Sequence, residues 1–391
     1  MVLKKNEFGG LVKAYREQRG WTQEELAERW GHSRAYISQI EAGKRKLDRV
    51  AQVIRLADIL DIPQERLEAI GRGIPERKIK PASPAQADDA ILQMLLVPGK
   101  DMVRLSWLAW FADAAPHIEE SLRELMSDLE QALTEYHGEF VAPAQQLLAY
   151  THQMIGKIAY DRLDYAAAGG HFSTMIDLGQ ELNDADIITT GMVHQGDVLR
   201  KRGRYDAGIR LFEAAKPFAA SASPGVRGRL YMIMSRAYAS HGDEKLFLSS
   251  ADQAIEIAKE VKDTLDNLAN QFSLVDALQE KAQGYTVLWK PEEALKIYKE
   301  TDRLRPFRLL RDKGSYAIVK AQAYSYTGDL DKGLKYARRG LELASQYQSK
   351  RHIARLETMY RRLHVTPLGS DRRIQELGEA LRENRKIRAT W

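Results

Sequence analysis

Apolar residues recur at intervals of three or four positions along most of the 391-residue chain, which is the period of a helix that buries one face. No stretch alternates apolar and polar residues as a half-buried strand does. Residues 71–89 interrupt the helical period with three Pro and two Gly. We therefore predict an all-α protein with a small domain at residues 1–72, a linker at 73–89 and a larger domain at 90–391.

The small domain contains five short amphipathic segments. They cover Glu7–Gln18, Gln23–Trp30, Arg34–Ala42, a fourth helix capped by Asp48 and a fifth that begins near Pro63. Thr22 and Glu25 have the spacing of a capping box, and Ser33 can cap the third helix. Gly31 lies in the tight turn before that helix. Two short helices joined by such a turn, the second beginning with small polar residues, suit insertion into a DNA major groove.

The segment TQEELAERWGHSRAYISQIEAGKRK, from Thr22 to Lys46, resembles the XRE/Cro/phage-repressor family of DNA-binding domains, and the resemblance extends over residues 7–70. It implies a five-helix domain whose third helix reads bases. The resemblance places Ser33, Arg34, Ala35, Tyr36, Ser38 and Gln39 at base-facing and groove-edge positions, and Gln23, Lys44 and Arg45 at phosphate contacts. It also implies a buried ion pair between Arg16 and Glu41.

The third helix carries side chains suited to base recognition. Arg34 can donate two hydrogen bonds to guanine and Gln39 can pair with adenine, each worth about 1–3 kcal/mol of discrimination. His32, in the preceding turn, is expected to serve as a turn or phosphate contact. One domain of this size rarely suffices, so we expect a homodimer that places two copies about 34 Å apart on a palindromic operator.

The sequence departs from the family pattern at four residues. Leu47 stands where Pro is frequent, and Asp61 where Gly is frequent. Trp21 and Trp30 replace aliphatic residues. A degenerate helical domain that contacts proteins is the alternative. The polar third helix and the basic residues at 44–49 favour DNA instead.

An internal repeat accounts for the length of the larger domain. Five segments align, with turn residues Leu163, Gly203, Gly242, Trp289 and Gly328 at spacings of 39–47 residues. They resemble tetratricopeptide repeats, whose usual period is about 34 residues, so the helices are expected to be longer. Small residues occupy the packing positions Gly156, Gly196, Ser235, Ala282 and Ala321 in the first helices, and Ala168, Gly208, Ala294 and Gly333 in the second. Phe247 breaks the second column, with Ala251 one turn later as if large and small residues had been exchanged.

Further helices are expected to cover both ends of this helical solenoid. Residues 88–140 form the first cover, and their Trp107, Trp110 and Phe111 are interpreted as a buried cluster, with a ligand cage as the alternative. Residues 350–391 form the second. Their Arg-rich face is expected to be solvated, with a role in dimerisation or DNA approach as the alternative.

The first helix of each repeat lines the concave surface of such a solenoid. Positions at helical spacing from the small packing residues predict a groove composed of Gln153, Lys157, Tyr160, Asp197, Arg200, Arg229, Met232, Arg236, Gln279, Gln283, Ile318, Gln322 and Tyr326. Carboxamides can bind an extended peptide backbone, while Arg229 and Arg236 can hold a carboxylate. The alternative is a groove of solvated residues without a ligand.

Composition and charge narrow the function. Cysteine is absent, which excludes disulfides and thiolate chemistry and suits the cytoplasm. The longest apolar run, Ala90 to Val97 with one Gln, is too short to cross a membrane, and the N-terminus lacks a signal sequence. Residues 1–80 hold 17 Lys and Arg against 12 Asp and Glu. Their net charge of +5 equals the net charge of the whole chain. No motif for a nucleophile, phosphate loop or metal site is present, so no enzyme activity, cofactor or metal is predicted.

The order of the two modules resembles the peptide-sensing quorum regulators of bacteria and their phages, the RRNPP group. That resemblance implies a short linear peptide that binds in the groove and alters DNA affinity. Two other hypotheses remain. In one, the repeats serve only to dimerise or to recruit a partner protein; in the other, they house an enzyme such as a phosphatase-like activity.

Overall fold

A computed structural model describes residues 7–388 apart from 31, 46, 48–55, 58, 64–65, 67–83, 112–117, 262–271 and 305–308. The chain divides into two compact units, Met1–Ala82 and Ser83–Trp391. Each unit is described by itself.

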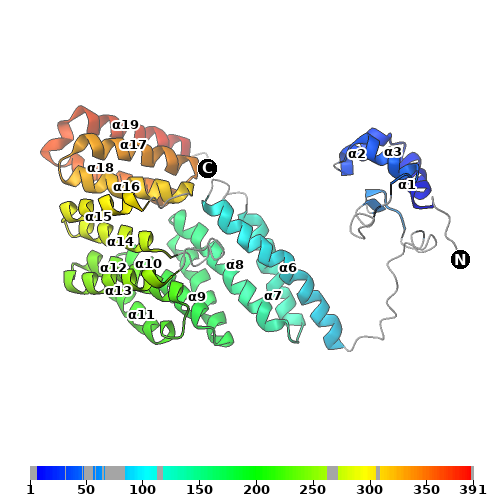
Figure 1. Ribbon diagram of the computed structural model, residues 1–391, viewed down its shortest axis with the longest axis horizontal. Helices are drawn as coiled ribbons and strands as arrows, with labels where there is room; N and C mark the ends of the chain where they lie inside the picture. Colours follow the sequence, from blue (N-terminus) through cyan, green and yellow to red (C-terminus); the bar gives the residue numbers. More distant parts are fainter. Residues whose placement is uncertain are drawn as a thin grey trace. The chain divides into compact units, whose positions relative to one another are not determined.

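Three helices of the first unit are described: α1 (Glu7–Gln18), α2 (Gln23–Trp30) and α3 (Arg34–Glu41) (Figure 1). The predicted bounds are confirmed for α1 and α2, and α3 ends one residue early. The capping box is present, since the Thr22 N–H donates to Glu25 Oε2 at 2.7 Å and the Glu25 N–H donates to Thr22 Oγ1 at 3.2 Å. Most of the predicted fourth and fifth helices, together with Gly31 and Asp48, lies outside the described residues.

Two of the departures from the family pattern have visible structural consequences. Trp30 is 3% exposed and joins a core that includes Leu26 and Ile37. Asp61 adopts a φ of 41°, the left-handed region in which glycine is most easily accommodated. Short polar Asp is one of the few other residues that enters this region at modest cost.

The second unit begins with α6 (Pro84–Phe111) and α7 (Glu119–Glu135). Six helix pairs follow, and they are shown in Figure 1. They are α8 (Val141–Asp161) with α9 (Tyr165–Leu182), α10 (Ala185–Lys201) with α11 (Tyr205–Ala219), α12 (Pro224–His241) with α13 (Glu244–Glu260), α14 (Leu274–Val287) with α15 (Pro291–Arg303), α16 (Leu310–Tyr326) with α17 (Leu330–Gln346), and α18 (Lys350–His364) with α19 (Arg372–Arg388). A short 3-10 turn at Pro367–Ser370 joins the last pair.

The linker prediction was too long at its C-terminal end. Residues 84–89, expected to be linker, form the first turns of α6. Pro84 is the first residue of this helix, where its fixed φ is favourable and its missing N–H has no helical partner to lose. Residues 73–83 lie outside the described part of the chain.

The five predicted repeats are confirmed as five helix pairs, and their turns are alike. All five aligned turn residues have a positive φ: 69° at Leu163, 76° at Gly203, 93° at Gly242, 59° at Trp289 and 85° at Gly328. In each repeat the chain therefore reverses at a residue in the left-handed backbone conformation, at the aligned position. Leu163 and Trp289 adopt this conformation although bulky residues rarely do.

Small residues in the first helices make room for large residues in the second. A Cβ added at Gly196 would lie 2.3 Å from the Phe212 ring. Phe247, which breaks the repeat pattern, is fully buried against the next repeat, where a Cβ at Gly284 would lie 2.2 Å from its ring. The exchange of large and small residues in the third repeat thus reflects packing between repeats.

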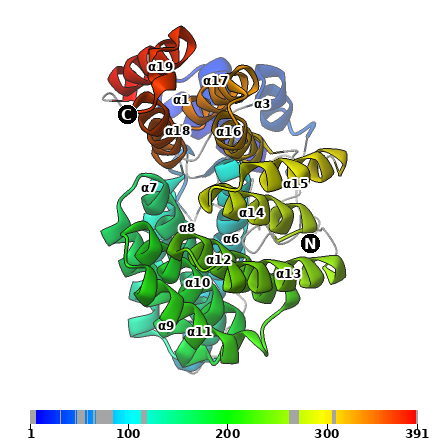
Figure 2. The ribbon, with the colours of Figure 1, turned by 90° about the vertical axis from the view of Figure 1, so that its left-hand side faces the viewer.

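The first helices of the second unit form a closed series. Each of α8, α10, α12, α14, α16 and α18 contacts the next, and α18 also contacts α8 (Figure 2). Helix α6 contacts both α8 and α16. No described helix combines the length and apolar character that crossing a bilayer requires.

Candidate functional site

Helix α3 presents a polar face to solvent and buries the other. Its face predicted to read bases is largely exposed: Ser33, Arg34, Ala35, Ser38 and Gln39 are exposed, and Tyr36 is half-buried. Ile37, Ile40 and Glu41 are buried. The Ser33 hydroxyl caps the helix by accepting a hydrogen bond from the Tyr36 N–H at 3.3 Å, as predicted.

The buried face of α3 is fixed by an ion pair. Arg16 Nε and Nη2 donate to the two carboxylate oxygens of Glu41 at 2.6 and 2.9 Å. Arg16 Nη1 also donates to the Trp21 carbonyl at 2.6 Å. The hydrogen bond with Glu41 raises the pKa of Arg16. The predicted pair is confirmed, and it joins α1 to α3.

The predicted phosphate contacts lie on both sides of α3. Gln23 is half-buried and its Nε2 donates to Glu41 Oε2 at 2.8 Å. Lys44 and Arg45 are exposed, and their backbone N–H groups donate to the Gln39 carbonyl at 2.9 and 3.0 Å. The Arg45 guanidinium lies 4.4 Å from the centre of the Tyr36 ring. These contacts attach Lys44 and Arg45 to the end of α3.

The second unit contains a cavity of about 180 Å³ at the centre of its first helices. The cavity is lined by residues of α6, α8, α10, α12, α14, α16 and α18. Seven predicted groove residues line it: Lys157, Tyr160, Asp197, Arg229, Met232, Arg236 and Gln279. Gln153, Arg200, Gln283, Ile318, Gln322 and Tyr326 are not among its lining residues.

Two of these six predictions are wrong because the side chains are fully buried. Gln153 lies against His194 at 3.2 Å between two first helices, and Ile318 belongs to the core between α16 and α17. The offset from the small packing residue is not constant. In α8 the lining residues follow Gly156, whereas in α14 they precede Ala282. From α8 to α16 the lining residues therefore lie progressively nearer the N-terminal end of each first helix relative to its small residue.

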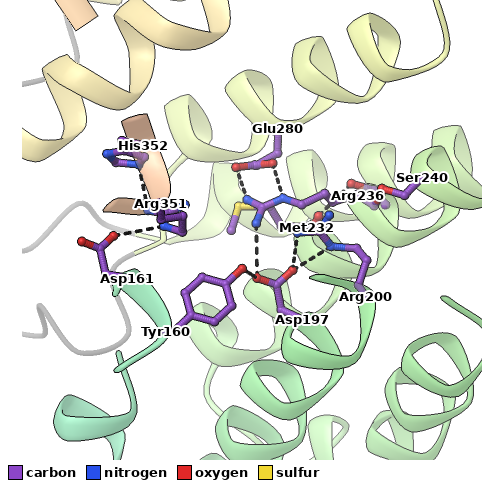
Figure 3. Close-up of polar contacts among 11 residues, drawn as sticks. Tyr160, Asp161, Asp197, Arg200, Met232, Arg236, Ser240, Glu280, Arg351 and His352 are labelled. Atoms are coloured by element: carbon purple, nitrogen blue, oxygen red, sulfur yellow. Dashed lines mark hydrogen bonds and ion pairs between the residues drawn. The ribbon is translucent and has the colours of Figure 1, made fainter. Parts of the chain in front are cut away.

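A network of charged side chains occupies one wall of the cavity (Figure 3). Asp197 accepts hydrogen bonds from Tyr160 and from Arg200 Nε, the latter at 2.8 Å, and lies 3.7 Å from Arg236. Burial alone would raise the pKa of Asp197, but the charges of Arg200 and Arg236 lower it. Arg236 also pairs with Glu280, with a distance of 2.7 Å between Nε and Oε2. Arg236, predicted to hold a ligand carboxylate, therefore already has two carboxylate partners.

A second network was missed by the sequence analysis. Asp161 accepts hydrogen bonds from Ser349 at 2.8 Å and Arg351 at 3.2 Å, and lies 3.0 Å from Arg311 Nη1. The Arg311 guanidinium lies 3.7 Å from the centre of the Trp110 ring. Arg351 and Arg355, from the segment expected to be a solvated Arg-rich face, line the cavity instead. In the sequence, the excess of Arg in residues 350–391 was the only signal that pointed to this segment.

Charges of both signs face the cavity without full compensation. Burial, followed by the charges of Arg229 and Arg351, lowers the pKa of Lys157, and burial and Arg351 lower the pKa of Arg355 to about 10. Burial raises the pKa of Asp276 to about 6, and burial together with Asp276 raises the pKa of Asp312 to about 7. The cavity therefore suits a ligand with both acidic and basic groups.

The aromatic residues of α6 form another wall. Trp107 and Trp110 are 3% and 5% exposed and belong to the core, which confirms the predicted burial, and Phe111 is half-buried. All three also line the cavity. The Trp107 indole N–H has no hydrogen-bond partner in the part of the chain that the structure describes. Within the same part, no group of three His, Asp or Glu residues is placed to hold a metal ion.

The first unit is a helix-turn-helix domain, since residues 7–70 match the family model described as "Helix-turn-helix domain". A curated relative is the HTH-type transcriptional repressor RghR of Bacillus subtilis (strain 168), with 45% identity over 60 residues. The match covers 15% of this chain and 44% of RghR, so the chain matches less than half the length of this relative.

Two solved structures are similar over most of their length but at low TM-score. One is Bacillus thuringiensis PlcR in complex with the peptide PapR7 and DNA, with 15% identity, coverage of 86% of this chain and 99% of that chain, and a TM-score of 0.29. The other is the TPR domain of P58(IPK), with 14% identity, coverage of 93% and 98%, and a TM-score of 0.21.

Proposed function

We propose that this chain is a sequence-specific DNA-binding transcriptional regulator whose repeat unit binds a short peptide that modulates DNA binding. The observation that carries the DNA-binding role is the exposed polar face of α3, which is held by the buried Arg16–Glu41 pair. A rigid helix with exposed polar residues at its start can enter a major groove without reorganising. The similarity to a transcriptional repressor over the helix-turn-helix domain supports the same role.

Three side chains have different roles in DNA recognition. Arg34 and Gln39 are exposed on α3, where they can reach base edges. Lys44 follows the helix and is placed for a phosphate. Base contacts determine sequence preference, whereas phosphate contacts contribute affinity for every duplex and make it salt-dependent.

The repeat unit supports an effector role through its cavity. Each of its six helix pairs contributes lining residues, so a ligand there touches all repeats at once. The volume of about 180 Å³ is below the roughly 300–1,000 Å³ of pockets that enclose a whole drug-sized ligand. It therefore suits one or two side chains of a peptide. Lys157 and Arg355 can bind an acidic group, while Asp276 and Asp312 can bind a basic one.

The DNA-binding role is tested by selecting duplexes from a random library with the full chain. Arg34→Ala and Gln39→Ala should each relax the preference at one base position, with a cost of about 1–3 kcal/mol. Lys44→Ala should weaken binding to all duplexes and reduce the salt slope by about one. Lys245→Ala, an exposed lysine of the second unit, is the control. Equal behaviour of the three α3-region variants would contradict the assigned roles.

The effector role is tested with a pooled library of random heptapeptides. Native mass spectrometry of the full chain should detect retained peptides, and Gln279→Ala should lose them. Gln283→Ala is a matched control, because Gln283 lies one turn further along α14 and does not line the cavity. A retained peptide should also change the affinity for the selected duplex. If no peptide is retained, the repeats only dimerise or recruit a partner, and the DNA-binding role is unaffected.

A further inference from the structure

Helix α6 has two apolar faces, and the described residues of the second unit cover only one of them. Leu92, Leu96, Val103, Trp107 and Trp110 are each at most 8% exposed and pack into the core. The opposite face exposes Met94 at 75%, Val97 at 66%, Leu105 at 52% and Leu108 at 40%. We call these four residues the α6 stripe.

The α6 stripe is the main concentration of exposed apolar side chains among the described residues. Twelve large hydrophobic residues are exposed there, and four of them lie within 15 consecutive positions of α6. At 100° per residue the four stripe residues and Asp101 fall within an arc of about 80°. Single exposed apolar residues are ordinary on a protein surface, whereas an aligned row of them indicates a contact.

The spacing of the stripe is symmetric. Met94, Val97, Asp101, Leu105 and Leu108 are separated by three, four, four and three positions, so the series is the same in either direction. The mean interval of about 3.5 residues is that of helices that pack along their length. Two antiparallel copies would therefore place an apolar residue opposite an apolar residue at every step except the central one, where Asp101 meets its own copy.

We propose that the α6 stripe is the contact between two copies of this chain, with their α6 helices antiparallel across a two-fold axis at Asp101. Met94 then meets Leu108 of the partner subunit, and Val97 meets Leu105 of the partner subunit. A two-fold contact requires one patch that is complementary to itself, and the symmetric series has this property.

The charges at the axis fit the same arrangement. The side chain of Asp101 is 65% exposed. At the two-fold axis it faces Asp101 of the partner subunit. Arg104 is 61% exposed and its Nη2 lies 3.5 Å from Asp101 Oδ1 within the chain. One turn from the axis, Arg104 can pair with Asp101 of the partner subunit. The two symmetric pairs offset the repulsion between the two carboxylates.

The position of α6 gives this contact a function, which rests on the proposed DNA-binding role. Helix α6 begins two residues after the end of the helix-turn-helix unit. A dimer joined there brings two recognition domains to one duplex, as a palindromic site requires. The contact itself is tested without DNA, so failure of the two proposals can be distinguished.

The test uses the full chain in sedimentation velocity over a range of concentrations. The natural chain should be a dimer, and Leu105→Glu should raise the dimer dissociation constant by roughly 100-fold or more. Leu246→Glu is the matched control, because Leu246 is 43% exposed on α13 and should leave the dimer unchanged. Far-UV circular dichroism confirms that both variants are folded.

A charge exchange provides an independent arm. Asp101→Arg should weaken the dimer by roughly tenfold, and adding Arg104→Asp should restore it.

The monomeric Leu105→Glu chain should keep its base preference on a half-site and lose the additional affinity for a palindrome. A natural chain that is monomeric at all concentrations, or a Leu105→Glu chain that remains a dimer, would overturn the proposal. A monomer in which Leu105→Glu releases the helix-turn-helix unit to protease would also overturn it, in favour of a contact within one chain.

Discussion

Arg351 Nε lies 3.2 Å from Asp161 Oδ1, although 190 positions separate the two residues in the sequence. Asp161 is the last residue of α8 in the first repeat, and Arg351 is the second residue of α18 in the last pair. Their contact joins the two ends of the repeat series at the wall of the cavity (Figure 3). A peptide that altered the pitch of the repeats would have to loosen or tighten this junction, because the series is closed there.

Asp161→Asn should destabilise the second unit by about 3–5 kcal/mol, since it leaves Arg311 and Arg351 buried without a carboxylate. Equilibrium urea unfolding followed by tryptophan fluorescence measures the loss, because Trp110 stacks on Arg311. Asp177→Asn, at an exposed position of α9, is the control and should change stability by less than about 0.5 kcal/mol. Similar unfolding midpoints for the two variants would show that the junction contributes nothing.

Asp312 should make the stability of the second unit depend on pH. Its pKa is about 7 in the folded chain against 3.8 for an unperturbed carboxyl, so the folded state binds this proton more tightly. The stabilisation is complete below about pH 4 and is lost as the pH rises through 7. Asp312→Asn should remove a fall of about 2 kcal/mol between pH 5 and pH 8, roughly half of the full linkage value because the cavity is open to solvent.

The measurement for Asp312 is the urea midpoint at pH 5, 6, 7 and 8. Asp177→Asn should retain the natural pH dependence. Asp276, with a pKa of about 6, should leave a smaller fall in the Asp312→Asn chain. An unaltered slope in that chain would refute the assignment of the proton to Asp312.

Two glycine substitutions should have opposite signs. Gly203 has a φ of 76° and open space around it, so Gly203→Ala should cost about 1 kcal/mol from backbone conformation alone. Gly170 lies inside α9 with equally open surroundings, so Gly170→Ala should stabilise by about 0.5–1 kcal/mol. Thermal unfolding of both variants against the natural chain tests the pair. A stabilising Gly203→Ala would mean that the turn does not require a left-handed residue.

The helix-turn-helix domain was largely readable from the sequence, because its signals are local. A capping box, a helix cap and an apolar period each depend on residues within one or two turns of one another. They therefore gave the bounds of α1 and α2, and the cap at Ser33, correctly. The Arg16–Glu41 pair, 25 positions apart, was reached through the family resemblance and not through any local pattern.

In the repeat unit, the sequence predicted the turn residues but only some of the residues that line the cavity. The alignment identified all five left-handed turn residues, even where Leu163 and Trp289 replace glycine, because a turn is fixed by its immediate neighbours. The cavity residues were only partly identified. A fixed offset from each small residue assumes that the cavity meets every first helix at the same point along its length, whereas the lining residues follow Gly156 in α8 and precede Ala282 in α14.

By itself the sequence determined the helices, their caps, their turns and the order of the two modules, all of which follow from hydrogen bonding and periodicity over short distances. The tertiary structure alone decided that Asp161 meets Arg311 and Arg351, that Arg236 is paired with two carboxylates, and that the described residues of the second unit leave one face of α6 exposed. These features depend on how helices pack that lie far apart in the sequence, as for Asp161 and Arg351 at 190 positions, and patterns among neighbouring residues do not predict such contacts.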